Sequence, residues 1–126
     1  MKLSDLPSIL ASYDFNFASE AELQHAIEQI LEIEGFTFLR EVKLSDSDRI
    51  DFLIKDSDQD PEIKAAGVEV KTRFGNNDVL RQLHRYAGHD RISQLFLVTT
   101  KTLHAVPDEI SGKRVTTIQL GVSHSL

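Results

Sequence analysis

Two acidic residues and a lysine are the groups along the chain that could do chemistry together. Asp51 lies in the segment RIDFLI, and Glu69 and Lys71 lie two positions apart in the segment GVEVK. Magnesium prefers oxygen ligands and needs only one or two protein carboxylates, because water and a substrate phosphate fill its other positions. The three residues therefore predict a divalent-metal phosphodiesterase site.

The geometry of strands explains how these residues could meet. Side chains alternate between the two faces of a strand, so Glu69 and Lys71 share one face, opposite the valines beside them. Asp51 lies between two apolar residues, Ile50 and Phe52. If the apolar positions of both strands are buried on the same face of a sheet, Asp51 lies on the face of Glu69. Two carboxylates without a cation repel each other, which is a cost that a purely structural role would leave unexplained.

A helix and three strands are predicted to position this group. Ser19 and Glu22 fit a capping box, after which apolar residues recur at helical spacing until Gly35. Three strands are predicted next, over residues 36–44, 49–55 and 67–72. Polar loops separate the strands and favour an antiparallel meander.

A second helix and two more strands are predicted to follow. Asn76 and Asn77 offer caps for the helix, and Gly88 is predicted to end it. The apolar run QLFLVTT then predicts a strand that is covered on both faces and reached by a right-handed parallel crossover. A final strand over residues 115–120 follows a turn at Gly112.

The three chemical residues resemble motifs of the PD-(D/E)xK, or restriction-endonuclease-like, nuclease superfamily. Asp51 stands at the aspartate position of its second motif, although Ile50 replaces the proline of the name. Glu69 and Lys71 stand as its ExK pair. The resemblance covers residues 19–100, and the combined pattern is more specific than any of its parts.

Both predicted helices add to the resemblance. Gln82 and Tyr86, in QLHRY, are similar to the QxxxY motif of the RecB-type, Holliday-junction-resolvase-like subgroup. Four positions apart on a helix, they lie on one face and could point together at the site or at a bound strand. The family usually supplies a glutamate from the first helix, for which Glu20 and Glu22 are candidates. Glu20 is preferred because Glu22 is already explained as the partner in the capping box.

The length of 126 residues suits one domain. The resemblance implies an α/β fold with a restriction-endonuclease-like core, in the order α-β-β-β-α-β, and a mixed central sheet flanked by helices. We expect the core over residues 19–100, an N-terminal arm or short helix over 1–18, and a C-terminal turn and strand over 101–126.

The implied activity is magnesium-dependent hydrolysis of DNA phosphodiester bonds, as an endo- or exodeoxyribonuclease, with manganese able to replace magnesium. Three acids and one backbone carbonyl would hold the metal: Glu20, Asp51, Glu69 and Val70. Lys71 would orient the attacking water or stabilise its hydroxide form. The resemblance also suggests structure-selective cleavage, and the small size favours a homodimer that engages two strands.

Charge is unevenly divided along the chain. The net charge of −6 argues against a protein that coats nucleic acid with a uniformly positive surface. Residues 1–70 hold 6 Lys and Arg against 16 Asp and Glu, whereas residues 71–126 hold 8 against 4. The cations between Lys71 and Arg91 could face phosphates. We expect Gln82 and Tyr86 to position the strand. Three arginines are predicted as phosphate contacts: Arg73, Arg81 and Arg85.

Several classes of protein are excluded or disfavoured. The absence of cysteine excludes disulfides, thiolate zinc sites and thiol nucleophiles, and it permits a reducing cytosol. The histidines show no zinc-binding spacing. The triplet Asp56, Asp58 and Asp60 imitates a calcium loop, but Pro61 and Gly67 occupy positions that such a loop gives to glycine and glutamate. No apolar run approaches the roughly 20 residues of a membrane span, and no secretion signal opens the chain. We therefore expect a cytoplasmic protein without membrane contact or organic cofactor.

Simpler interpretations stay open for the predicted site. Asp51, Glu69 and Lys71 could form an exposed strand face with a cross-strand ion pair. Tyr86 could simply pack in the core with its hydroxyl satisfied, and the arginines of the second helix could be solvated. The rival function is a catalytically inactive nuclease-like module that binds DNA or a partner protein.

Overall fold

The computed structural model of the chain describes residues 2–73, 76–100 and 106–121. Its helices are the short 3-10 helix η1 (Leu3–Asp5), α1 (Leu6–Ala11), α2 (Glu20–Ile33) and α3 (Asn76–Ala87). Its strands are β1 (Phe38–Lys43), β2 (Arg49–Lys55), β3 (Ala65–Lys71), β4 (Ile92–Thr99), β5 (Glu109–Ile110) and β6 (Lys113–Gln119). The sequence α2-β1-β2-β3-α3-β4 confirms the predicted order of the core.

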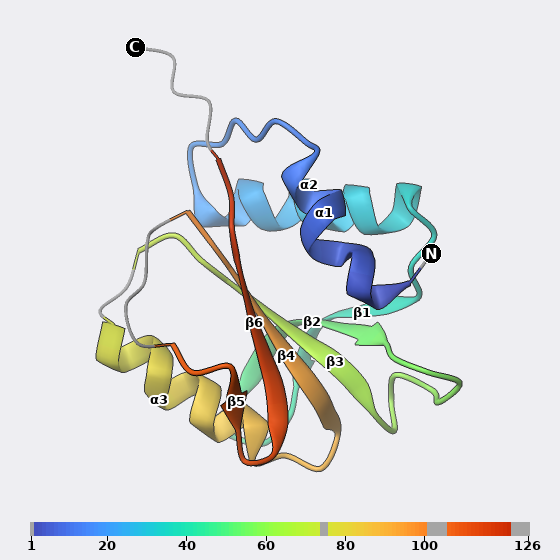
Figure 1. The fold of residues 1–126 in the computed structure, drawn as a ribbon, viewed down its shortest axis with the longest axis vertical. Helices are drawn as coiled ribbons and strands as arrows, with labels where there is room; N and C mark the ends of the chain where they lie inside the picture. Colours follow the sequence, from blue (N-terminus) through green and yellow to red (C-terminus); the bar gives the residue numbers. More distant parts are fainter. Residues whose placement is uncertain (1, 74–75, 101–105, 122–126) are drawn as a thin grey trace.

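The strands form one mixed sheet in the order β1-β2-β3-β4-β6-β5 (Figure 1). β1, β2 and β3 pair antiparallel, as the predicted meander requires. β4 pairs parallel with β3 and with β6, so α3 is the crossover helix. The two-residue strand β5, which was not predicted, pairs antiparallel with β6. The predicted mixed sheet flanked by helices is confirmed.

Helices cover both faces of this sheet. α1 and α2 lie together on one side, and α3 lies on the other (Figure 1). Phe52, Val68 and Val98 belong to the core under α1 and α2, which we call the α2-side core. Leu53 and Leu97 belong to the core under α3, the α3-side core. Residues of β4 enter both cores, which explains why its sequence is apolar at consecutive positions.

The helix ends follow the sequence signals in part. The hydroxyl oxygen of Ser19 accepts the backbone N–H of Glu22 at 3.2 Å, as an N-cap does. Gly35, with a φ of +83°, follows the end of α2. The residues predicted as caps of α3, Asn76 and Asn77, are instead its first two residues. Polar residues suit the first turn because its N–H groups have no acceptor within the helix.

The hairpin of β1 and β2 twists strongly at Asp51. Phe52 packs in the α2-side core, whereas Ile50 and its partner Val42 pack on the α3 side. The expectation that Ile50 and Phe52 share one face is therefore wrong. Pairing of β2 with β3 ends at Phe52, so the hairpin continues as a two-stranded ribbon, which twists more than a strand inside a sheet. Glu41, opposite the twist, has a positive φ of 51°.

A single arginine fastens α2 to this hairpin. The guanidinium of Arg40 lies 5.3 Å from the ring centroid of Phe52. Two of its nitrogens donate to Glu28 and Gln24 on α2, each at 3.1 Å. Because Gln24 is one turn from Glu20, these contacts also fix the first turn of α2.

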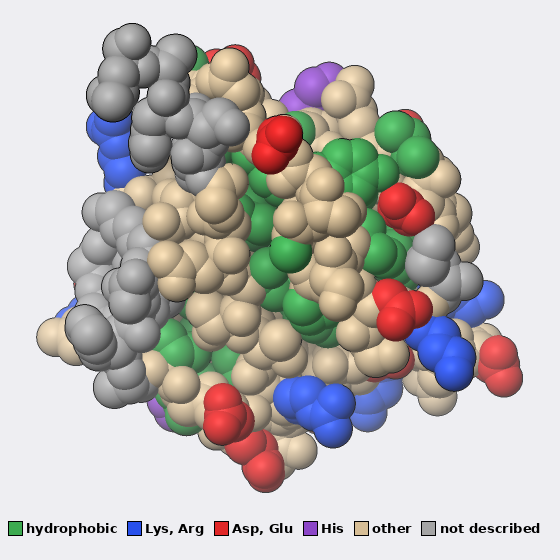
Figure 2. Space-filling view, turned by 45° about the horizontal axis from the view of Figure 1, so that its top comes forward, with side chains coloured by type: hydrophobic (Ala, Val, Ile, Leu, Met, Phe, Trp, Pro, Cys, Tyr) green, Lys and Arg blue, Asp and Glu red, His purple; other side chains and the backbone are tan. Residues whose placement is uncertain are grey.

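The surface carries both signs of charge. On the face drawn in Figure 2, acidic and basic side chains are interspersed, and no continuous basic area covers it. None of the helices in the described part of the chain is long and apolar enough to cross a membrane.

Candidate active site

The predicted site forms where β2 and β3 separate. The last backbone pair of these strands is Phe52 with Val68. Beyond this pair, the backbone N–H groups donate to two carboxylates and not to the carbonyls of the neighbouring strand. The N–H of Asp51 donates to Oε1 of Glu69 at 3.2 Å, and the N–H of Val70 donates to Oδ2 of Asp51 at 2.7 Å. Each carboxylate therefore binds the backbone of the other strand, which fixes the two acids beside each other.

The two acids share more negative charge than the chain compensates. Glu69 is only 3% exposed. Its burial, with the charge of Asp51 beside it, raises the pKa of Glu69 to about 8. Burial also raises the pKa of Asp51, against the opposing effect of the N–H of Val70. Nζ of Lys71 lies 3.4 Å from Oε2 of Glu69. One ammonium faces two acids, and the pKa of about 8 means that Glu69 holds a proton near neutral pH, which a cation could displace.

The side chains of the QxxxY motif point at this group. The single proton of the Tyr86 hydroxyl is shared between two acceptors, the carbonyl oxygen of Arg49 at 2.8 Å and Oε2 of Glu69 at 3.2 Å. The hydroxyl oxygen accepts in turn from Nε2 of Gln82 at 2.7 Å. Burial and the charge of Glu69 raise the pKa of Tyr86, so the phenol keeps its proton. Tyr86 packs in the α3-side core and also reaches Glu69, so the two interpretations of this residue coincide.

The two candidate acids of α2 make different contacts. Oε1 of Glu20 accepts the N–H of Thr72 at 2.9 Å and its hydroxyl at 3.4 Å, directly after Lys71. Glu22 stays with Ser19 at the cap. The charge of Glu20 contributes to the raised pKa of Asp51, behind the larger effect of burial. Glu20, and not Glu22, therefore lies at the edge of the site.

The predicted phosphate contacts differ in their surroundings. Arg73 is exposed next to the residue that binds Glu20. Arg81 is exposed and lies 3.6 Å from Asp78, one turn earlier on α3. Nε of Arg85 donates to Oδ1 of Asp48 at 2.9 Å, and half of the Arg85 side chain is exposed. Of the three arginines, only Arg85 is bound to a buried acid.

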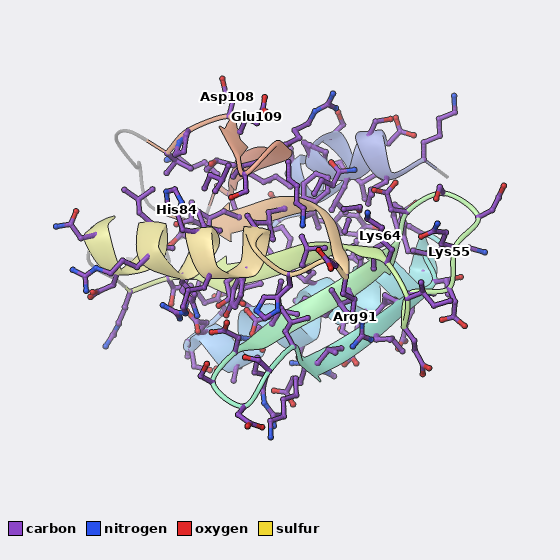
Figure 3. The ribbon with its side chains drawn as sticks, turned by 90° about the horizontal axis from the view of Figure 1, so that it is seen from below. Lys55, Lys64, His84, Arg91, Asp108 and Glu109 are labelled. Carbon is purple, nitrogen blue, oxygen red and sulfur yellow. The ribbon has the colours of Figure 1, made fainter. Side chains whose placement is uncertain are left out.

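Not all cations of the second half of the chain converge on the site. Arg91 lies with Lys55 and Lys64 at the end of the sheet away from His84 and the first turns of α3 (Figure 3). The pairing of β3 with β4 begins at this end and reaches Lys71 at the other. Nε of Arg91 donates to the carbonyl of Pro61 at 3.4 Å. The segment from Lys71 to Arg91 therefore does not present a single basic surface.

One buried acid was missed by sequence reasoning. Asp48 is 6% exposed, and its carboxylate contacts Arg85 and Nε2 of His89, the latter at 3.0 Å. The hydrogen bond with His89, and after it the bond with Arg85, holds the pKa of Asp48 below its ordinary value. Asp48 lies in a run of Ser and Asp that reads as a solvated loop, so no pattern distinguished it. The spacing of Arg85 and His89, four positions apart, was the one available signal.

The donor set fits a hard divalent cation. The structure brings together the carboxylate oxygens of Asp51 and Glu69, which suit magnesium or manganese and not a softer metal. Among residues 2–73, 76–100 and 106–121, no group of three or more His, Cys, Asp or Glu is arranged to hold a metal ion. Two carboxylates are enough for magnesium, because it keeps several of its waters.

Comparison with known proteins shows the family of the chain. No curated protein and no solved structure matched the chain. A family model described as "Restriction endonuclease" (Mrr_cat) matches residues 16–121, which include both strands of the site and α3. Nucleases of this kind act on DNA and generally use divalent metal ions. The chain belongs to the restriction endonuclease family Mrr_cat, within the PD-(D/E)xK-like nucleases.

Proposed function

We propose that this protein is a divalent-metal-dependent deoxyribonuclease whose catalytic centre is the carboxylate pair of Asp51 and Glu69 with Lys71. The observation that carries the proposal is the reciprocal bonding of the two acids across the separated strands, with one ammonium 3.4 Å away. A structural ion pair would balance its charges. Here a buried acid, Glu69, and a partly buried acid, Asp51, both with raised pKa values, face one lysine.

The proposed metal ligands are Asp51, Glu69 and the carbonyl of Val70, with Glu20 as the third acid at the edge of the site. Magnesium, or manganese in its place, would supply positive charge to the scissile phosphate and to the water that attacks it. The N–H of Val70 and the N–H of Asp51 hold the carboxylates in place before the substrate arrives. Such preorganised ligands avoid the cost of ordering them during the reaction.

Lys71 is the proposed residue that orients the attacking water. Its ammonium lies on the strand that carries Glu69, and its side chain is about a quarter exposed. It can therefore contact both the buried acid and a water that comes from solvent. As the phosphate gains negative charge, a fixed ammonium stabilises it more than a solvated one would.

DNA is proposed to bind over the exposed end of this strand. Arg73 and Arg81 are free to contact phosphates through exposed side chains, and Arg85 through the part of its guanidinium that Asp48 does not bind. Gln82 and Tyr86 would position the strand indirectly, since their polar atoms already hold Glu69. None of these contacts reads bases, so structure-selective cleavage is the proposed form of specificity.

The proposed functional unit is a single domain over residues 1–126 that acts as a homodimer on two strands. A domain of 14.2 kDa with one catalytic group would cut one strand per copy. Sedimentation of the protein with and without a four-way junction would show whether two copies bind one substrate.

The proposal is tested by cleavage assays on plasmid, flap and four-way-junction DNA, with magnesium, with manganese and with a chelator. Asp51→Asn is the test variant. Asp56→Asn is the matched control, because Asp56 follows the other end of β2 and binds Ser93 and Gln94. We expect metal-dependent cleavage by the parent and the control, and none by Asp51→Asn. An Asp51→Asn protein as active as the parent would remove the assignment.

The second candidate is an inactive nuclease-like module that binds DNA or a partner protein. It is favoured by the lack of a three-acid metal group among the described residues. Calorimetric titration with magnesium or manganese separates the two functions. Binding that disappears in Asp51→Asn supports the enzyme, whereas no binding by the parent supports the module.

A further inference from the structure

We propose that Asp48, Arg85 and His89 form a positioning clamp, which holds the twisted end of the β1–β2 hairpin against α3 so that Asp51 stays opposite Glu69. For its catalytic consequence this inference rests on the proposed function. The hydrogen bonds of the Asp48 carboxylate are made with Arg85 and His89, and not with the carboxylate pair or the lysine. The clamp would therefore act through the backbone and through Tyr86.

The hairpin needs such a clamp because of where its pairing ends. β2 pairs with β3 from Phe52 to Lys55, so the residues of β2 before Phe52 have β1 as their one neighbouring strand. A two-stranded ribbon is less constrained, and twists more, than a strand inside a sheet. Asp51 lies directly before the paired part of β2, where side-chain bonds with Glu69 and Val70 link it to β3. Whether these bonds keep their geometry therefore depends on what holds the end of the hairpin.

Asp48 is the residue that closes this end. Its carbonyl accepts the N–H of Leu44 at 2.7 Å and that of Ser45 at 3.3 Å, and its own N–H donates to the hydroxyl of Ser45 at 3.1 Å. Its carboxylate points the other way, to Arg85 at 2.9 Å and to His89 at 3.0 Å. One buried residue thus shapes the turn and fastens it to α3.

The contacts of the clamp continue directly into the site. The carbonyl of Arg49, next to Asp48, accepts from the hydroxyl of Tyr86, which also donates to Glu69. Tyr86 follows Arg85 on α3. One segment of α3 therefore holds the start of β2 and one of the two catalytic acids. His89 is held in addition by Nζ of Lys113, which donates to its carbonyl at 2.7 Å.

The first test is amide hydrogen exchange of the metal-free full chain at Val70 and Asp51. These two N–H groups donate to the carboxylates, so their exchange reports directly whether the acids stay in place. In Asp48→Asn we expect exchange at both amides to quicken about tenfold, as the loss of a charge-assisted bond implies, while amides of β4 stay unchanged. Asp56→Asn neutralises a carboxylate that binds Ser93 and Gln94, far from the clamp, and should leave the exchange of all these amides unchanged. Parent-like exchange at Val70 and Asp51 in Asp48→Asn would overturn the clamp.

A pair of variants at His89 keeps the test decisive if Asp48→Asn does not fold. His89→Gln retains a nitrogen that can donate to Asp48, whereas His89→Leu does not. We expect slow exchange at Val70 in His89→Gln and fast exchange in His89→Leu. Equal exchange in the two variants would contradict the role of the hydrogen bond.

The catalytic test separates positioning from contact with DNA. Loss of a residue that orients metal ligands typically costs about 10- to 100-fold in activity or metal affinity. We expect His89→Leu, which leaves Arg85 bound to Asp48, to lower kcat by this factor with the KM for DNA unchanged. An unchanged kcat would overturn the catalytic role of the clamp. A parent that cleaves no DNA under any metal would refute the proposed function instead, and hydrogen exchange would still decide whether the clamp holds Asp51.

Discussion

Two acidic residues are buried to a similar degree in this protein, yet the neighbouring side chains carry charges of opposite sign. Asp48 is 6% exposed and meets Arg85 and His89, which lower its pKa. Glu69 is 3% exposed and meets a second acid, Asp51, and its pKa rises to about 8. A buried acid whose charge the chain balances is an anchor. A buried acid whose charge the chain leaves unbalanced is poised for a cation that comes from outside, as functional sites often are.

The largest difference between the two acids should be seen when each is neutralised. Glu69→Gln keeps the size of the side chain but removes a charge on which the proposed metal depends. A metal ion contributes several kcal/mol to phosphoryl-transfer chemistry, so we expect DNA cleavage to fall about a thousandfold. At pH 9 the metal-free variant should nevertheless melt at a higher temperature than the parent, because it buries no charge at this position. Cleavage rates and thermal unfolding of the same preparations measure both effects. Lower thermal stability together with normal cleavage would reverse our assignment of the two acids.

Asp48→Asn should instead destabilise the protein. It weakens two bonds to a charged group, each of the kind that contributes about 1.5–3 kcal/mol, although solvent screening of the half-exposed Arg85 reduces this. We expect the free energy of unfolding at pH 7 to fall by about 1–2 kcal/mol in urea titrations. Asp56→Asn, whose carboxylate binds only neutral partners, serves as the reference. A loss no greater than that of the reference would show that Asp48 is not an anchor.

The response to pH sharpens the comparison further. The pKa of Glu69 is raised on folding from the ordinary 4.5 to about 8, so its contribution to stability is fully present below pH 4.5 and is lost as the pH rises through about 8. We expect the melting temperature of the metal-free parent to fall over this range, and that of Glu69→Gln to fall less.

Magnesium requires the ionised form of Glu69, so it should bind more tightly above pH 8 and release protons on binding near neutrality. Calorimetry in two buffers of different ionisation enthalpy would detect the protons. Their absence would contradict the shifted carboxyl.

The smallest effect is expected at the hydroxyl that joins the two regions. Tyr86→Phe keeps the packing of the ring in the α3-side core but leaves the carbonyl of Arg49 and one oxygen of Glu69 without this donor. We expect a loss of stability of about 0.5–1.5 kcal/mol and a moderate loss of kcat. Gln82→Leu, which removes only the bond donated to the hydroxyl, should have a weaker effect. Equal effects of the two variants would indicate that the hydroxyl acts chiefly as an acceptor.

Much of the core could be predicted because its signals are local. The bounds of the second strand were predicted residue for residue, since the charged residues Arg49 and Lys55 flank a run that is apolar except at Asp51. The parallel crossover through α3 followed from a helix placed between a strand and an apolar run. The prediction was wrong where local spacing gave no information, as at the two asparagines that begin α3.

Contacts between distant segments were harder to predict. Arg91 was grouped with the cations near Lys71, but the parallel strands carry the two residues to opposite ends of the sheet. Arg85 was expected to be either solvated or bound to phosphate, and its Nε instead binds Asp48. The contact of Arg85 with Asp48 could not be predicted from the sequence, because an acid in a polar loop has the same local pattern whether it is buried or solvated.

The sequence by itself determined that Glu69 and Lys71 share a strand face, because the period of a strand is fixed by backbone geometry. It also determined the order of the elements that carry them, through the spacing of apolar residues. Only the tertiary structure decided that β2 and β3 separate at Asp51, that Ile50 and Phe52 enter different cores, and that Asp48 is balanced while Glu69 is not. These features depend on burial and on the charges that folding brings together, and both are properties of the packed chain and not of any segment of it.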